Sequence, residues 1–235
     1  MKKEEFIQSI EASTKRKKAD IVFKNAQIVD VFNSEIISGD VAVTNGRIVG
    51  IGDYEGNEEI DISGKYLCPG LIDGHVHIES SMVPPHEFAK VVLPHGVTTV
   101  IADPHEIANV SGVKGIQYML DSSEGILLDV YVMLPSSVPA TSFEHAGARL
   151  EAVDLEPLFD HERVIGLAEV MDYVAVQTAS DSMLDKLEMT TRHSRLIDGH
   201  MAGLPADLIN VYRSAGIMTD HEVTNAAEAK ERVQR

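Results

Sequence analysis

Two histidines, His75 and His77, stand two positions apart in an apolar run that is typical of a β-strand. Side chains two positions apart in a strand point to the same face, so both imidazoles could reach one metal ion. Alone, a His-x-His pair is weak evidence for a metal site. The preceding residues 69–74 place this pair in the first of a series of alternating strands and helices, which makes the prediction strong.

More histidines and carboxylates fall where later strands are expected to end. His105 and Glu106 follow the second strand, Glu169 ends the fourth, and His200 and His221 follow the fifth and sixth. In a parallel α/β barrel the active site lies at the C-terminal ends of the strands. The side chains of Glu169, His200 and His221 therefore complete, with the first histidine pair, a nitrogen and oxygen ligand set that suits zinc, manganese or iron.

The elements that must position these residues alternate between strand and helix after residue 69. Apolar, strand-like runs recur, and most are followed by a stretch compatible with a helix. Strands are expected at residues 71–76, 97–102, 127–134, 164–170, 195–199 and 216–219, and helices at 86–93, 113–120, 181–191 and 206–213. This alternation predicts a parallel sheet of the βαβ type, and so an α/β fold of the TIM-barrel kind.

The first 69 residues have a different pattern. A short helix is expected over residues 2–18, followed by short β-branched runs separated by turn residues. Asn45-Gly46 between two such runs is a strong signal for a two-residue hairpin. We therefore predict two domains. Residues 1–69 form a helix and a small antiparallel β unit, and residues 70–235 form the larger α/β domain.

The composition excludes several classes of protein. The chain has 235 residues with 37 Asp and Glu against 20 Lys and Arg, a net charge of −17, which argues against a nucleic-acid partner. No apolar run approaches the roughly 18 residues that a membrane span requires, and the charged N-terminus lacks a signal core. A single cysteine rules out a zinc site built on a cysteine pair. A cytoplasmic protein with a small-molecule substrate is expected, and a homo-oligomer stays open.

One segment resembles the first barrel strand of the amidohydrolase superfamily, a group of metal-dependent hydrolases: CPGLIDGHVHIESSM. The β unit before it resembles part of the small β-sandwich that accompanies the barrel in that superfamily. Within the superfamily the chain is most similar to the bacterial adenine deaminases. This finer resemblance rests on GLIDGHVHIESSMVPPHEFAKVVLPHGVTTVIADPHEIANV, GLAEVMDY, IDGHMAGL and TDHEVTNAAEA, and it covers essentially the whole chain.

The resemblance implies a dinuclear metal centre and a reaction. His75 and His77 would bind one metal, His200 and His221 the second, and Glu169 would bridge them and so take part in catalysis. Adenine deaminases of this type are associated with manganese or iron rather than zinc. They convert adenine and water to hypoxanthine and ammonia through a metal-activated hydroxide.

The resemblance also implies that the barrel is incomplete. A full barrel has eight strands, and the superfamily carries its main proton carrier, an aspartate, at the end of the eighth. This sequence predicts about six strands and ends at Arg235. We expect an N-terminal portion with impaired or no activity alone. The alternatives are a non-catalytic truncated paralogue that binds metal or a partner, and another amidohydrolase that acts on a cyclic amide.

Four further residues are candidates for the reaction. His105 and Glu106 could contact the substrate or support a metal ligand, and they could equally cap the helix that follows. Glu79 could hold the edge of a purine or orient a ligand histidine, with capping again the alternative. His145, in the long loop after the third strand, is a candidate substrate contact.

Overall fold

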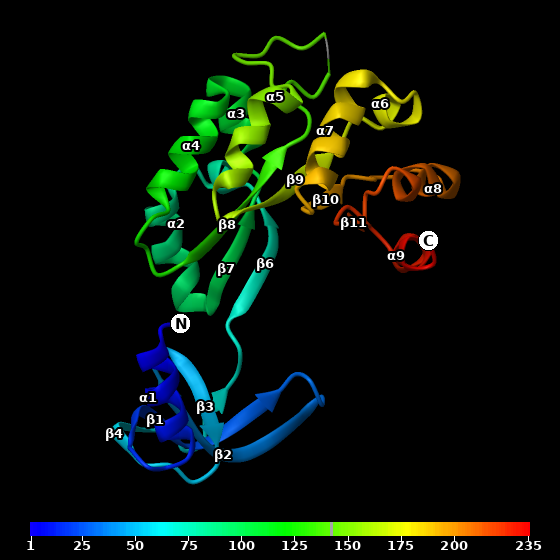
Figure 1. Ribbon diagram of the computed structural model, residues 1–235. Coiled ribbons are helices and arrows are strands. Elements are labelled where there is room, and N and C mark those ends of the chain that lie inside the picture. The colour runs from blue at the N-terminus through cyan, green and yellow to red at the C-terminus, as the bar shows by residue number, and fades with distance from the viewer. Residues whose placement is uncertain (142) are drawn as a thin grey trace. The chain divides into compact units, whose positions relative to one another are not determined.

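The computed structural model of this chain describes residues 1–141 and 143–235. It divides into two compact units, Met1–Pro69 and Gly70–Arg235, each with its own sheet (Figure 1). The two are described separately below.

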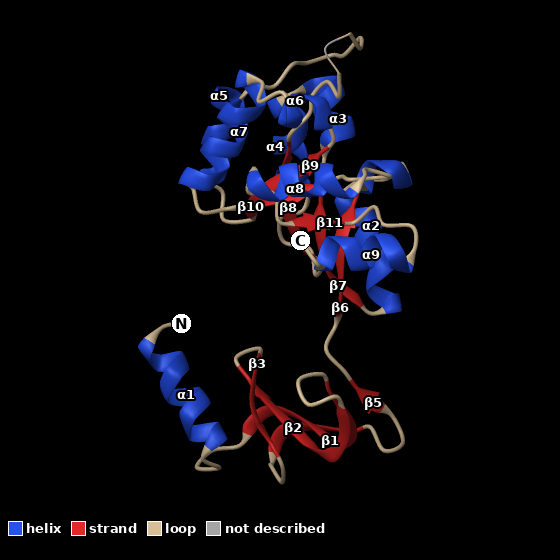
Figure 2. Ribbon diagram, turned by 90° about the vertical axis from the view of Figure 1, so that its right-hand side faces the viewer, coloured by secondary structure: helices blue, strands red, loops and turns tan. Residues whose placement is uncertain are grey.

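The first unit is a helix and a five-stranded sheet (Figure 2). Helix α1 packs against strands β2 and β3. The hairpin at Asn45-Gly46 is present, with both residues at positive φ (53° and 69°) between antiparallel β2 and β3. The elements are α1 (Lys3–Ser13), β1 (Ala19–Asp30), β2 (Glu35–Thr44), β3 (Arg47–Ile51), β4 (Gly56–Asp61) and β5 (Tyr66–Leu67).

The expectation of a purely antiparallel unit is wrong. Strands β4 and β5 both pair with β1 in parallel, because the chain crosses from β3 to the far side of β1 instead of turning back on itself. Residues 21–23 and 27–30 belong to separate β-branched runs of the sequence, but they lie in one long strand, β1. This strand has an irregularity between Phe23 and Ala26, where Asn25 has a φ of 60°.

The second unit is built on six parallel strands in the order of the sequence, β6 to β11, which confirms the predicted incomplete barrel. Each strand pairs with the next in parallel. The strands are β6 (Leu71–Val76), β7 (Val97–Ala102), β8 (Asp129–Pro135), β9 (Val164–Val170), β10 (Leu196–Gly199) and β11 (Thr219–Asp220).

Helices connect these strands, and α4 and α7 pack against the sheet at β8 and at β9 and β10 (Figure 1). The four helices expected from the sequence are present within a few residues of their predicted bounds as α2, α4, α7 and α8. The connecting elements are η1 (Ile78–Ser81), α2 (Pro85–Val92), η2 (Leu93–His95), α3 (His105–Ser111), α4 (Val113–Ser122), α5 (Ala152–Leu155), η3 (Glu156–Asp160), α6 (Tyr173–Gln177), α7 (Asp181–Arg192), α8 (Ala206–Ser214) and α9 (Ala226–Val233).

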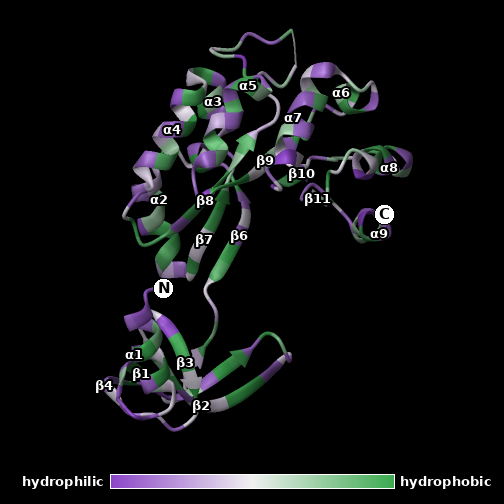
Figure 3. Ribbon diagram, viewed as in Figure 1, coloured by the Kyte–Doolittle hydropathy of each residue, from purple (hydrophilic) through white to green (hydrophobic). Residues whose placement is uncertain are grey.

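The main core lies around the central strands β8 and β9, which are mainly hydrophobic (Figure 3). Strands buried on both faces are near-continuous apolar runs, and Val132, Leu134 and Leu167 in these strands are fully buried. This packing fixes the strand ends from which polar residues project. Within the described ranges, every helix is too short or too polar to cross a membrane.

Candidate metal centre and active site

His75 and His77 converge at the end of β6, as their spacing predicts. The Nε2 atoms of the two rings are 3.1 Å apart. The Nδ1 atom of His77 lies 2.9 Å from the backbone carbonyl oxygen of Asp103, the residue that follows β7. A donor–acceptor contact of this kind fixes the ring and leaves Nε2 directed at the first histidine.

Glu169 lies at the centre of the cluster. Its Oε1 is 2.6 Å from Nε2 of His75 and 2.7 Å from Nε2 of His77. The residue is 4 % exposed and stands near the end of β9 with a φ of 27°, a left-handed backbone that non-glycine residues rarely adopt. Burial raises the pKa of this carboxyl, but the hydrogen bonds from His75 and His77 outweigh it and hold the pKa below its usual range.

His200 and His221 approach the same carboxylate from two other strand ends. Nδ1 of His200 is 3.3 Å from Oε2 of Glu169, and Nε2 of His221 is 3.8 Å from Oε1. The ring of His221 stacks on that of His75, with centroids 3.8 Å apart. Asp198 lies 3.0 Å from Nδ1 of His221, and this carboxylate raises the pKa of the histidine.

A buried ion pair joins the two loops that carry His200 and His221. Nε of Arg232, from α9, donates to Oδ2 of Asp220 at 2.8 Å, and its Nη2 donates to the carbonyl oxygen of Met201 at 2.6 Å. The other oxygen of Asp220 accepts from the backbone N–H of Met201 at 3.0 Å. Because β10 and β11 are only four and two residues long, these side-chain contacts hold the loops beyond them.

A second group of titratable residues surrounds His77. Asp103 is fully buried, and its Oδ2 is 3.0 Å from Nδ1 of His105. Burial raises the pKa of Asp103. Oε2 of Glu106 lies 3.2 Å from Nδ1 of His77, and the carboxylates of Glu106 and Glu169 raise the pKa of His77 to about 11. His105 and Glu106 are thus placed beside the cluster, while α3 has no side-chain hydrogen bond at its N-cap.

Glu79 and His145 lie in different surroundings. Oε1 of Glu79 accepts the backbone N–H of Ile107 in α3 at 3.3 Å, and its Oε2 is buried with no hydrogen-bond partner in the described part of the chain. Glu79 therefore holds α3 and keeps one oxygen free beside the site. His145 is exposed in the loop between β8 and α5, outside the cluster, and its role in substrate binding stays a prediction.

Three residues of this site were not predicted from the sequence. The sequence indicates only that Asp103 is a carboxylate after a strand and that Glu222 follows His221. Neither position by itself predicts a place in the site. Oε1 of Glu222 lies 4.0 Å from Nδ1 of His200 and 3.8 Å from Nε2 of His221, so it faces the second histidine pair. Ser136, whose hydroxyl contacts the backbone of Glu169, carries no signal in the sequence.

The donor set fits divalent metal ions. Three overlapping groups have ligand atoms within 4.8 Å of one another: His77, Asp103, His105 and Glu169; His75, Glu169 and His221; and His200, His221 and Glu222. Nδ1 of His200 and Nε2 of His221 are buried without a hydrogen bond among the described residues, and the Glu169 oxygens lie 3.3 and 3.8 Å from them. Imidazole nitrogens and carboxylate oxygens without thiolates suit borderline and hard divalent cations.

The amidohydrolase family matches residues 66–233 of this chain, and the N-terminal domain of the urease alpha-subunit matches residues 3–65. The chain belongs to the amidohydrolase family.

Curated relatives of this amidohydrolase are adenine deaminases. That of Geobacillus kaustophilus is 65 % identical over 226 residues, which cover 96 % of this chain and 39 % of the relative. That of Bacillus subtilis is 58 % identical over 235 residues, which cover 100 % of this chain and 41 % of the relative. The chain thus spans about two fifths of the length of the relatives it matches.

Solved structures show the same fold at low sequence identity. The N-acyl-D-glutamate deacylase from Bordetella bronchiseptica, complexed with zinc and a phosphonate inhibitor, superposes with a TM-score of 0.58 at 17 % identity. The match covers 93 % of this chain and 55 % of the deacylase. The atrazine chlorohydrolase from Arthrobacter aurescens, complexed with zinc, gives a TM-score of 0.54 at 14 % identity over 91 % of this chain and 67 % of the chlorohydrolase.

Proposed function

We propose that this chain supplies the metal centre and adjoining residues for the hydrolytic deamination of adenine to hypoxanthine and ammonia. One observation carries the proposal. Four histidines from three strand ends surround the single carboxylate of a fourth, Glu169, with nitrogen–oxygen distances of 2.6–3.8 Å. The identity of 50–65 % to adenine deaminases over nearly the whole chain supports adenine as the substrate.

The residues divide into two ligand pairs around one bridging group. His75 and His77 would hold the first divalent ion, His200 and His221 the second, and Glu169 would bridge the two. We propose manganese or iron rather than zinc. When bound, the ions supply Lewis acidity and lower the pKa of a water that attacks C6 of the purine.

The proton steps are assigned to residues beside His77. Oδ2 of Asp103 accepts from Nδ1 of His105, which leaves Nε2 of that ring to exchange a proton with the leaving amine. Oε2 of Glu106 is buried 3.2 Å from Nδ1 of His77, and Oε2 of Glu79 is buried without a hydrogen-bond partner in the residues described. We propose that His105 and Glu106 act in proton transfer and that Glu79 holds an edge of adenine.

A chimaera tests the substrate, because the chain spans only part of its relatives. The matched region of the Bacillus subtilis adenine deaminase is replaced by this chain, and adenine is supplied with Mn²⁺. We expect release of ammonia and formation of hypoxanthine. We expect Glu169→Gln to reduce turnover at least 100-fold, as removal of a metal ligand does more harm than removal of its support. Glu162→Gln, at an exposed glutamate, serves as the matched control and should leave turnover unchanged.

Other products would support the alternatives. A ring-opened product from a cyclic amide would favour another amidohydrolase activity. A chimaera that binds metal and turns over nothing would favour a non-catalytic metal-binding module. For the isolated chain we expect two Mn²⁺ per molecule by elemental analysis and ammonia release far below that of the chimaera. A cytoplasmic location and a homo-oligomer stay predictions.

A further inference from the structure

The backbone of Glu169 is strained, so neighbouring residues must hold it in its conformation. A φ of 27° costs free energy for any residue with a Cβ, and surrounding structure must hold such a conformation in place. The strand ladder gives limited help here. The last residue pair between β8 and β9 joins Pro135 to Ala168, one residue before Glu169. On the other side of β9, the register with β10 is irregular between the pairs formed by Leu167 and Val170.

Beyond the last pair of β8 and β9, a side-chain hydroxyl forms the hydrogen bond to Glu169. Oγ of Ser136 donates to the carbonyl oxygen of Glu169 at 2.6 Å, and both residues are buried, at 1 % and 4 % exposure. Since the Ser136 proton is used in this bond, the contact of 3.1 Å between the hydroxyls of Ser136 and Ser137 is donated by Ser137. The bond restrains the carbonyl group of Glu169 itself, on the C-terminal side of the strained residue.

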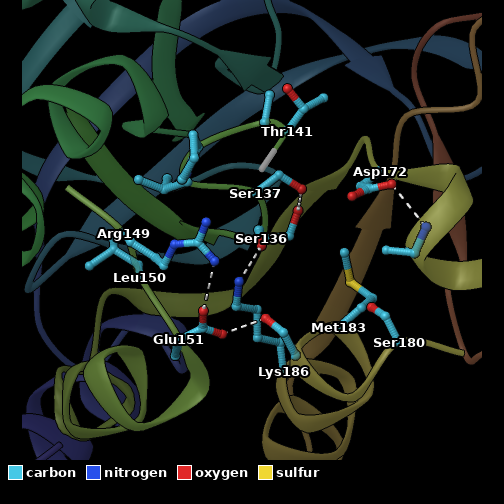
Figure 4. Close-up of a pocket in the computed structure, with 15 residues that line it drawn as sticks. Ser136, Ser137, Thr141, Arg149, Leu150, Glu151, Asp172, Ser180, Met183 and Lys186 are labelled. Atoms are coloured by element: carbon cyan, nitrogen blue, oxygen red, sulfur yellow. Dashed lines mark hydrogen bonds and ion pairs between the residues drawn. The ribbon is translucent and has the colours of Figure 1, made fainter. Parts of the chain in front are cut away.

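A buried lysine holds Ser136 in turn. Nζ of Lys186, from the middle of α7, donates to the carbonyl oxygen of Ser136 at 2.9 Å, and Lys186 is 5 % exposed. Figure 4 shows the lysine nitrogen directed at Ser136 in the wall of a cavity of about 160 Å³. Within residues 1–141 and 143–235 no carboxylate lies at ion-pair distance from this ammonium group. Its direct polar contact is therefore the serine at the end of β8.

We propose that Ser136 and Lys186 are positioning residues for Glu169. The Ser136 hydroxyl holds the Glu169 peptide in the conformation that turns its carboxylate toward the histidines, and Lys186 holds the Ser136 backbone. The inference rests on the proposed function, in which Glu169 bridges two metal ions. In this proposal both residues act through Glu169 rather than on the metals or on adenine.

Metal binding by the full 235-residue chain tests this relay. We expect Ser136→Ala to weaken Co²⁺ or Mn²⁺ affinity by about 10- to 100-fold, the range for groups that orient metal ligands. Lys186→Met should weaken it less, by about threefold to tenfold, because it acts one step further away. Ser137→Ala is the matched control. It removes a neighbouring buried hydroxyl that does not reach Glu169, and the affinity should change less than threefold.

A spectroscopic readout separates positioning from general destabilisation. At saturating Co²⁺ and at a temperature where circular dichroism shows each variant folded, the visible absorption of the bound ions should change in Ser136→Ala and return in Ser136→Thr. Unchanged affinity and spectrum in Ser136→Ala would overturn the inference, and so would an equal loss in Ser137→Ala. If Ser136→Ala does not fold, Lys186→Met decides, and wild-type affinity in that variant overturns the relay. A wild-type chain that binds no divalent ion would instead overturn the proposed function.

Discussion

Two buried cationic side chains, Arg232 and Lys186, support two parts of the candidate metal centre. They differ in the groups that they bind. Arg232 forms an ion pair with Asp220, and the two side chains are 9 % and 1 % exposed. It supports the loops of His200 and His221. Lys186, behind Glu169, donates to a backbone carbonyl and has no carboxylate within ion-pair distance in the described ranges. Its burial lowers its pKa.

The difference shows two solutions to the same problem. The short strands β10 and β11 end before their loops begin. The loops are joined by the ion pair and by its two hydrogen bonds to the backbone of Met201. Strand β9 is long and buried, and only the peptide at Glu169 needs help. A charge-compensated pair is costly to break from one side, since the partner is left buried and charged. An ammonium without an ion-pair partner can be removed at lower cost, since a neutral carbonyl is left behind.

The largest expected effect is therefore on Arg232. Arg232→Met leaves the Asp220 carboxylate buried without its partner, which should reduce the free energy of unfolding by about 3–5 kcal/mol. The measurement is urea unfolding followed by circular dichroism. Lys230→Met, at an exposed residue of the same helix, is the control and should change stability by less than about 0.5 kcal/mol.

A double variant identifies the cause of that loss. Asp220→Asn in the Arg232→Met background removes the stranded charge and should restore part of the stability. If the double variant is no more stable than Arg232→Met, the loss comes from packing and the assigned role of the ion pair is wrong.

Lys186→Met should have a smaller effect on stability. The substitution costs the hydrogen bond to Ser136 but also removes a buried charge that has no ion-pair partner in the described ranges, so we expect a loss of only about 1 kcal/mol. The same urea titration measures it. A loss of unfolding free energy as large as that of Arg232→Met would mean that Lys186 stabilises the fold as much as the ion pair does. The proposed difference between the two cations would then be wrong.

The sequence indicates the histidines and the glutamate of this cluster more clearly than the residues that support them. His75 and His77 are recognisable because a two-residue spacing on a strand has one geometric meaning. The strand–helix alternation then placed Glu169, His200 and His221 at strand ends that meet. Those inferences depend on local periodicity, which a single sequence displays. The structure brings all five side chains together, and their role as metal ligands is a proposal for experiment.

The supports depend on contacts between residues far apart in the chain. Arg232 lies in a highly charged helix, where an arginine is ordinarily solvated, and only the fold reveals Asp220 beside it. Lys186 has an ordinary position in an amphipathic helix. The positive φ of Glu169 has no counterpart in residue type, because glutamate gives no sign of it. In the first unit, the parallel pairing of β4 and β5 with β1 likewise depends on a crossover that strand-like runs do not specify.

The smallest expected effect is the pH dependence that distinguishes the two cations. A buried lysine with a lowered pKa releases its proton in the folded state while the unfolded chain, with a pKa of 10.5, still holds it. Because the unfolded state then binds more protons, stability rises with pH from the lowered pKa up to about 10.5. The difference in unfolding free energy between wild type and Lys186→Met should therefore grow over this range. Groups that do not interact with Lys186 titrate alike in both proteins, so their contributions cancel in the difference.

Arg232 should show no such dependence, because a guanidinium stays protonated throughout this range. Urea titrations at pH 7, 8, 9 and 10 of wild type, Lys186→Met and Arg232→Met supply the comparison. A difference that is constant with pH for Lys186→Met would mean that the ammonium is compensated in place after all. Lys186 would then need an anionic partner, as Arg232 has. The two cations would differ only in the number of hydrogen bonds that each one makes.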